Sequence, residues 1–386
     1  MVDERANVIA SGDRHVIASG DRLVIAGGGL AGAAAAALLA QGGRRPLLLE
    51  RTSDAHDKVC GEFLSTEAQA HLAALGFNAA RLGGSPIDRV RLVSGGRSAE
   101  ARLPFTALGL TRRRLDAALL DHAAAAGAKV ERGVTVRTVD GTALATTGGD
   151  LTPATLLLAT GKHDVRGAKR DTAGTLDHLI GFKQYYRPNA ATLRDLAGVI
   201  EIVLFDGGYA GLQRVEDGVV NLCLLVGRAR FDASGGGEGL LADLLREPHL
   251  ARRLGSATPL LDRPLTISGV PYGFVHRGED SAFRLGDQAG VIPSFSGDGM
   301  SIALHSARLA AAAVLGGAGA ADYHARFRRD VAAQIARATW LQRAGETVAG
   351  RHLLVAGIGM VPPLLRWAAT LTRVPPAALR RAGVAA

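Results

Sequence analysis

The chain has 386 residues, of which 47% are hydrophobic and 21% charged, so it can bury a large core and divide into two domains. Its two cysteines, Cys60 and Cys223, exclude a disulfide framework and favour a reducing compartment, so we expect a cytoplasmic protein. The net charge of +9 comes mainly from arginines that are spread along the chain without interleaved aromatic residues. We therefore expect no nucleic-acid partner.

The two ends of the chain show no pattern typical of a signal peptide or a membrane span. The heptapeptide Val-Ile-Ala-Ser-Gly-Asp-Arg occurs at residues 8–14 and again at 16–22, and residues 1–21 are expected to form a flexible tail. The apolar segment 353–371 is interrupted by Pro362, Pro363 and Arg366, so we expect at most peripheral membrane contact through it.

The hydrophobic pattern predicts an α/β protein with an antiparallel insert. Helices are expected over 31–40, 65–75, 111–126, 301–315 and 322–343. Strands are expected over 23–26, 47–50, 129–139, 156–159, 179–186, 199–205, 211–215, 219–226, 265–275 and 283–285, with a hairpin over 87–105 that turns at Gly95 and Gly96.

A glycine pattern follows the first strand. Gly27, Gly29 and Gly32 form G-x-G-x-x-G between that strand and the first helix, which is the context that dinucleotide binding requires. The first glycine makes the turn, the second admits a pyrophosphate and the third allows close packing of helix and strand. Glu50 ends the second strand, where an acid binds ribose hydroxyls. The pattern alone leaves FAD and NAD open.

A second segment resembles flavoproteins with the p-hydroxybenzoate hydroxylase fold. Residues 283–290, followed by Pro293, Gly297, Gly299 and Met300, resemble the second FAD fingerprint of that superfamily. The resemblance implies that Asp287 binds the ribityl chain and that Gly297–Met300 lies against the flavin pyrimidine edge, where a helix N-terminus stabilises negative charge. FAD is thus the expected cofactor, in a Rossmann-like domain with an inserted antiparallel substrate-binding sheet and C-terminal helices.

Further segments resemble the same superfamily. Arg112, in Thr111-Arg112-x-x-Leu115-Asp116, matches an arginine that reaches the FAD pyrophosphate or flavin, and Thr160-Gly161 matches a segment near FAD. Lys58-Val59-Cys60-Gly61 resembles the branch of geranylgeranyl reductase-like flavoproteins, in which the cysteine lies near the flavin. Cys60 is therefore a candidate proton donor, or else a small packed residue. The resemblance also implies cofactor contacts from a further set of residues, namely Leu30, Ala31, Arg51, Lys58, Cys60, Gly61 and Val136.

The resemblance implies a discontinuous FAD-binding domain of residues 22–86, 108–177 and 275–325. Residues 87–107 and 178–274 would form the substrate sheet, and residues 326–386 a C-terminal helical region. Pro271–Phe274 resembles a substrate-cavity strand of the reductase branch, which favours Tyr272 as a substrate contact. The other aromatic candidates on this sheet are Tyr185, Tyr209 and Phe205, and strand alternation prevents Tyr185 and Tyr186 from facing the same side.

Three functions remain open. The first is a monooxygenase that hydroxylates an apolar or aromatic small molecule through a flavin C4a-hydroperoxide, and the second is a geranylgeranyl reductase-like reductase of carbon–carbon double bonds. The third is a flavin-binding partner protein without turnover. No second G-x-G-x-x-G follows a strand, so the expected electron donor is NAD(P)H bound transiently or a reduced partner protein. No metal-binding spacing is present, and no metal is expected.

Overall fold

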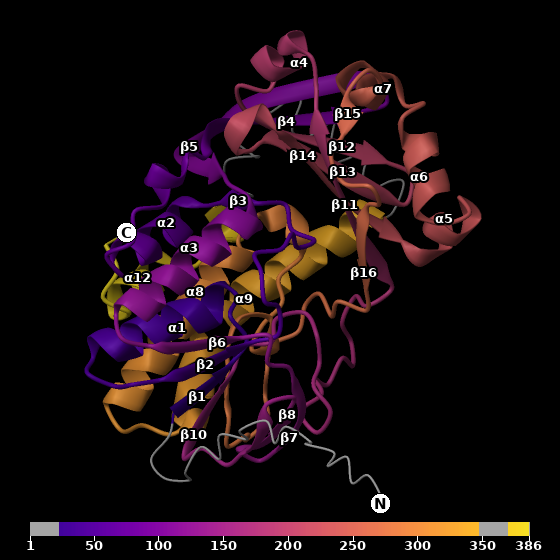
Figure 1. Cartoon of the computed structure of the whole chain (residues 1–386). Coiled ribbons are helices and arrows are strands. Elements are labelled where there is room, and N and C mark those ends of the chain that lie inside the picture. Colours follow the sequence, from indigo (N-terminus) through magenta and orange to yellow (C-terminus); the bar gives the residue numbers. More distant parts are fainter. Residues whose placement is uncertain (1–22, 347–369, 386) are drawn as a thin grey trace, which may run out of the picture.

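The computed structural model describes residues 23–346 and 370–385, and the expected tail 1–21 and most of the apolar segment 353–371 lie outside this range. Two sheets organise the chain. Figure 1 shows a parallel sheet in the lower half and a second, larger sheet in the upper half. The predicted fold class is confirmed: a Rossmann-like α/β unit carries an inserted sheet and ends in helices.

The parallel sheet has the strand order β17-β10-β1-β2-β6. Its strands are β1 (Leu23–Ala26), β2 (Leu47–Glu50), β6 (Lys129–Arg132), β10 (Thr155–Leu158) and β17 (Phe283–Arg284). The central strands are short, mostly apolar and almost completely buried, as expected for a parallel sheet that is covered on both faces. The predicted strand 129–139 divides at Gly133, whose φ of +75° ends β6.

Alternate side chains of these strands pack on opposite faces. Ile25 and Leu157 contact the helical layer, whereas Val24 and Leu156 pack on a small sheet. The helices of the chain's α/β part are α1 (Leu30–Gln41), α2 (Thr66–Ala73), α3 (Arg112–Ala125), α8 (Gly299–Leu315), α9 (Ala320–Glu346) and α12 (Pro376–Arg381). The small sheet, which was not predicted, comprises β7 (Val136–Asp140), β8 (Ala143–Thr146) and β9 (Gly149–Leu151).

The second sheet has the order β15-β11-β14-β13-β12-β4-β5-β3, with β16 also paired to β11. Its strands are β3 (Phe63–Leu64), β4 (Ser85–Ser94), β5 (Arg97–Gly109), β11 (Leu179–Arg187), β12 (Gly198–Phe205), β13 (Gly208–Arg214), β14 (Val220–Gly227), β15 (Thr258–Pro259) and β16 (Leu265–Ser268). The expectation of a wholly antiparallel sheet is wrong, because β12 runs parallel to β4. After the β4–β5 hairpin the chain builds part of the α/β unit and returns to this sheet as β11, and β12 then lies beside β4 in the same direction.

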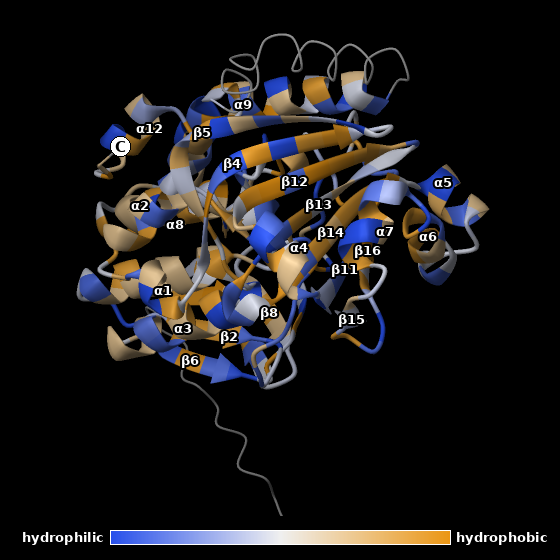
Figure 2. Cartoon of the chain, turned by 90° about the horizontal axis from the view of Figure 1, so that it is seen from above, coloured by the Kyte–Doolittle hydropathy of each residue, from blue (hydrophilic) through white to orange (hydrophobic). Residues whose placement is uncertain are grey.

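Short helices cover the outer face of this sheet and were not predicted. They are α4 (Ala190–Asp195), α5 (Arg228–Ala233), α6 (Gly237–Leu244) and α7 (Pro248–Leu254). Leu240 and Leu250 pack there against Leu222 and Val226 of β14. Figure 2 shows the central strands coloured mostly as hydrophobic, in agreement with burial on both faces. The other face of the sheet is turned toward the parallel sheet.

The predicted strand 265–275 is too long, because β16 ends at Ser268. Gly269 has a φ of +68° and Pro271 has no N–H to donate, so the extended pairing stops and a loop carries Tyr272. The helix starts are as expected: the side chains of Ser65 and Thr111 accept hydrogen bonds from the first turns of α2 and α3. The boundary expected between residues 325 and 326 falls inside α9.

Candidate functional site

A cavity of about 850 Å³ lies between the two sheets. Its walls come from the β1–α1 turn, the segment 56–63, the start of α3, the segment 159–165, the inner face of the second sheet and the segment 285–300. A volume of this size is in the range of cavities that hold a cofactor or a small molecule, about 300–1,000 Å³. Most of the candidate residues from distant parts of the sequence therefore meet in one place.

The glycine turn forms one end of the cavity. Gly27 has a φ of +111°, and a Cβ there would lie 2.4 Å from the carbonyl oxygen of Ala159. A Cβ on Gly32 would lie 1.9 Å from the carbonyl oxygen of Gly27, so Gly32 is a packing residue and does not line the cavity. A Cβ on Gly29, by contrast, would meet nothing closer than 3.7 Å. Gly29 is thus the residue of the turn that leaves room for a ligand.

Two cationic side chains, those of Arg112 and Lys58, lie next to this turn. The Arg112 and Lys58 side chains each reach to 3.7 Å from the position of a Gly29 Cβ. Both pair with the buried carboxylate of Asp116, Lys58 Nζ at 2.7 Å and Arg112 Nε at 2.8 Å. Burial opposes ionisation of Asp116, but Arg112 and Lys58 keep its pKa below the ordinary value. The α1 N-terminus, Leu30 and Ala31 complete an anion site that suits a pyrophosphate.

Glu50 lies at the end of β2, beside the turn. Its Oε2 accepts a hydrogen bond of 2.7 Å from the Gly28 backbone N–H, and its Oε1 accepts from Thr52. Burial raises the pKa of Glu50, but hydrogen bonds from Thr52 and Gly28 and the charge of Lys58 bring it below the ordinary value. Glu50 is therefore ionised where a ribose would lie. Arg51 also lines the cavity from this side.

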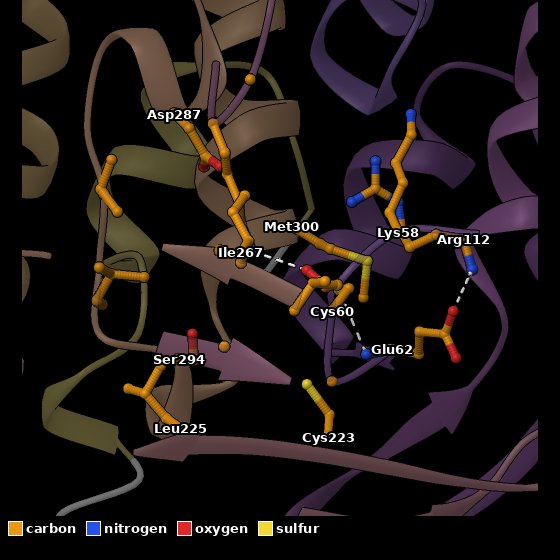
Figure 3. Close-up of a pocket in the computed structure, with 18 of the residues that line it drawn as sticks. Lys58, Cys60, Glu62, Arg112, Cys223, Leu225, Ile267, Asp287, Ser294 and Met300 are labelled. Atoms are coloured by element: carbon orange, nitrogen blue, oxygen red, sulfur yellow. Dashed lines mark hydrogen bonds between the residues drawn. The ribbon is translucent and has the colours of Figure 1, made fainter. Parts of the chain in front are cut away.

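The second fingerprint lies across the cavity. Asp287, Gly297, Gly299 and Met300 all line it, and α8 starts at Gly299, where a Cβ would meet nothing within 4 Å. Figure 3 shows Asp287 on the opposite side from Lys58 and Arg112. The remaining cofactor candidates, Val136, Thr160, Gly161, Cys60 and Gly61, are also lining residues. The open turn at Gly29 with its two cationic side chains, the carboxylate of Glu50 and the N-terminus of α8 line an elongated cavity. This arrangement would fit FAD.

Cys60 and Cys223 face the same part of the cavity (Figure 3). The Cys60 Sγ accepts a hydrogen bond of 3.3 Å from the Glu62 backbone N–H, and Cys60 also interacts with Arg112. Burial raises the pKa of Cys223 to about 12, so this thiol stays protonated at neutral pH. Cys60 therefore lies at the cavity wall, where it could serve as a proton donor or as a small packed residue.

Sequence reasoning missed an ion pair behind Cys60. Lys183 Nζ lies 2.6 Å from Glu62 Oε1, and both side chains are inaccessible to solvent. Tyr185 and the Arg112 backbone N–H donate to the same oxygen, at 2.7 and 2.8 Å. Glu62 has a φ of +60°, a left-handed conformation that is uncommon for a residue other than glycine. The sequence offered one signal for this pair: Glu62 directly follows the segment Lys58-Val59-Cys60-Gly61, which the resemblance had already placed near the flavin.

The four aromatic substrate candidates divide into two pairs. Tyr209 and Tyr272 line the cavity. Tyr185 and Phe205 do not line it: Tyr185 is engaged with Glu62, and Phe205 packs on the outer core with α6 and α7. Alternation explains Phe205, because Ile202 and Leu204 of the same strand point into the cavity. Tyr186, next to Tyr185, faces the outer core, so the two tyrosines do point to opposite sides.

Comparison with known proteins agrees with this geometry. Residues 22–153 match the family model of an FAD binding domain. No curated protein matches the sequence. The flavin-dependent brominase Bmp2 has a similar structure, with a TM-score of 0.75 and 16% identity over 95% of this chain and 98% of that chain.

Two further solved structures share the fold. PqsL of P. aeruginosa, in complex with 2-aminobenzoylacetate, has a TM-score of 0.69 and 17% identity over 88% of this chain and 99% of that chain. A geranylgeranyl bacteriochlorophyll reductase-like protein from Thermoplasma acidophilum has a TM-score of 0.66 and 16% identity over 94% of this chain and 95% of that chain. This chain therefore has the fold that these flavin-dependent and reductase-like proteins share, and its residues 22–153 resemble an FAD binding domain.

In the described part of the chain, no helix is both long and apolar enough to cross a membrane.

Proposed function

We propose that this protein is a monooxygenase that uses FAD to hydroxylate an apolar or aromatic small molecule. The observation that carries the proposal is the continuity of the cavity, which joins the phosphate-binding turn at Gly29 to an apolar wall of the second sheet. That wall is built by alternate residues of neighbouring strands, Val90 and Leu92 of β4 and Ile200, Ile202 and Leu204 of β12. When bound, FAD supplies electrons for the reduction of oxygen or of a substrate double bond.

The protein's own residues would position and shield the reaction. Lys58 and Arg112 hold the pyrophosphate, Glu50 the ribose and Asp287 the ribityl chain, while the sheet excludes water from the substrate. Similarity in structure to PqsL, which binds the aromatic 2-aminobenzoylacetate, supports a small aromatic substrate here. NAD(P)H bound transiently, or a reduced partner protein, would supply the electrons.

Reduction of a carbon–carbon double bond is the second candidate, and Cys60 is the observation that favours it. Its thiol lines the cavity and could give a proton to one carbon while hydride reaches the other, so that the double bond gains two hydrogens. The structural similarity to the geranylgeranyl bacteriochlorophyll reductase-like protein supports this candidate.

Product analysis separates the two functions. The FAD-loaded protein is reduced by NADPH without oxygen and then given a panel of apolar aromatic and polyprenyl compounds, with and without oxygen. A product that gains one oxygen atom only when oxygen is present supports the monooxygenase. A product that gains two hydrogens without oxygen, more slowly with Cys60→Ala, supports the reductase. Flavin that is bound but is never reduced by any donor and yields no product would instead support a partner protein without turnover.

A further inference from the structure

The cavity contains a cation that has no acidic partner among the described residues. Lys162 lines the cavity, and its Nζ donates a hydrogen bond of 2.7 Å to the backbone carbonyl of Val59. No described carboxylate lies at ion-pair distance from this ammonium group. The other cavity lysine and arginine near the turn, Lys58 and Arg112, are instead both paired with Asp116.

The surroundings keep Lys162 charged. Burial lowers its pKa, but electrostatic interactions with the groups around it, the carboxylate of Asp287 among them, outweigh that effect, and the net shift is upward. Lys162 is half-buried, and an ammonium group that is partly withdrawn from water is costly unless an acceptor or an anion compensates it. One backbone carbonyl satisfies only one of its three donors. A ligand that fills this cavity would therefore be expected to bring an acceptor to Lys162.

The hydroxyl of Tyr272, a residue that interacts electrostatically with Lys162, is hydrogen-bonded to a second hydroxyl. Ser294 Oγ donates a hydrogen bond of 3.0 Å to the Tyr272 hydroxyl, which leaves the Tyr272 proton available for another acceptor. Ser294 also interacts with the hydroxyl of Tyr209. Tyr272 is 3% exposed, so its hydroxyl cannot rely on bulk water. Lys162 and Tyr272 thus offer adjacent donors within a cavity whose sheet wall is apolar.

We infer that the substrate is an apolar molecule with one oxyanion head, a carboxylate or a phenolate, which Lys162 and the Tyr272 hydroxyl hold. This inference rests on the proposed function and adds the substrate class to it. The cofactor's anionic groups are accounted for elsewhere, since Lys58, Arg112 and the α1 N-terminus serve the pyrophosphate. Lys162 is then a specificity residue whose role is to select a charged head over a neutral one.

The test compares a matched pair of probes, 1-naphthoate and the neutral 1-naphthamide. Each is titrated into the FAD-loaded protein, and binding is followed through the change that it causes in the visible flavin spectrum. A charge-assisted hydrogen bond predicts that naphthoate binds about 10- to 100-fold more tightly. Lys162→Met should remove this preference, Tyr272→Phe should reduce it several-fold, and Lys129→Met, at an exposed lysine, should leave it unchanged.

Equal binding of the two probes by the natural protein, or a preference that persists in Lys162→Met, would overturn the inference. If the cofactor is the anion that Lys162 serves, Lys162→Met will weaken FAD binding or lower the flavin midpoint potential while the probe preference remains. The melting temperature of Lys162→Met without ligand should equal or exceed that of the natural protein, because an uncompensated charge is removed. A lower value together with an unchanged preference would make Lys162 a structural residue.

Failure of the proposed function gives a different result. A protein that binds no FAD refutes that function directly, and calorimetric titration of the same probes without flavin still tests Lys162. A protein that binds FAD and forms product, but does not distinguish naphthoate from naphthamide, refutes only the substrate class.

Discussion

Lys183 and Glu62 form an ion pair of 2.6 Å that is closed off from solvent on every side. Lys183 also donates to the backbone carbonyl of Lys58, at 3.1 Å, and Gln213 donates to the backbone carbonyl of Glu62, at 2.8 Å. The pair therefore fixes the segment 58–62 against β11 and β13, directly behind Cys60. The position of the Cys60 thiol relative to the cavity depends on this buried support.

Replacing only Glu62 should lower the stability of the protein far more than replacing Glu62 and Lys183 together. Glu62→Gln leaves the Lys183 ammonium buried without a counter-charge, so we expect the free energy of unfolding to fall by about 3–5 kcal/mol. The double variant Glu62→Gln/Lys183→Met should recover most of that loss. Urea unfolding followed by circular dichroism measures both, and a double variant less stable than Glu62→Gln alone would contradict this account.

Asp298, beside the start of α8, should make stability depend on pH. Burial raises its pKa from 3.8 to about 7, although Arg373, the Val374 N–H and Gln334 oppose the shift. Between about pH 4 and 7 the folded protein holds a proton that the unfolded chain has lost, so stability decreases as pH rises through this window. Asp298→Asn should remove that decrease, on the order of a few kcal/mol. Melting curves at pH 5 and 7.5 test this, and identical pH slopes for the two proteins would refute it.

The glycine turn gives a sharp test of the pyrophosphate site. Gly29→Glu should place a carboxylate beside Lys58 and Arg112, where the phosphate would bind, and FAD should be lost. Gly319→Glu is the matched control, because Gly319 is exposed and a Cβ there meets nothing within 4 Å. Wild-type flavin content in Gly29→Glu would invalidate the assignment.

Asp287→Ala should weaken FAD binding by about 1–3 kcal/mol, through the loss of a ribityl hydrogen bond.

Two tyrosines on the cavity side of the structure should behave differently. Tyr272→Ala should raise KM while the flavin content stays near that of the natural protein, because Tyr272 lines the cavity. Tyr185→Phe should leave KM unchanged and lower stability by about 1–2 kcal/mol, because its hydroxyl serves Glu62. Steady-state kinetics per bound flavin, with thermal melts, measure both. Loss of flavin in Tyr272→Ala at unchanged kinetics would identify Tyr272 as a core residue.

The parts of the fold that depend on local conformation could be predicted from the sequence. Gly27 and Gly32 are required by close backbone contacts, and Ser65 and Thr111 by helix capping, so each leaves a local pattern. The parallel pairing of β12 with β4 leaves no such pattern, because strand direction in a sheet depends on a connection through the rest of the chain. The assignment of segments to domains stays a prediction.

The site shows the same division. Gly29, Glu50 and Asp287 lie in motifs and were predictable, as was their approach to one cavity. The burial of Lys183 and the lack of an acidic partner for Lys162 among the described residues were not predictable, because an ion pair depends on residues that are distant in the sequence. Strand alternation excludes that Tyr185 and Tyr186 lie on the same face of the sheet. Only the three-dimensional structure shows that the Tyr185 hydroxyl donates to Glu62.

The flavin content of the purified protein tests the central claim most directly. After reconstitution with FAD and removal of the excess, the visible absorption spectrum and the protein concentration give the number of flavins per chain. We predict one FAD per chain, lost in Gly29→Glu, and released by acid because it is held without a covalent bond. A folded protein that retains no FAD, or that keeps its flavin attached after acid precipitation, would contradict the account.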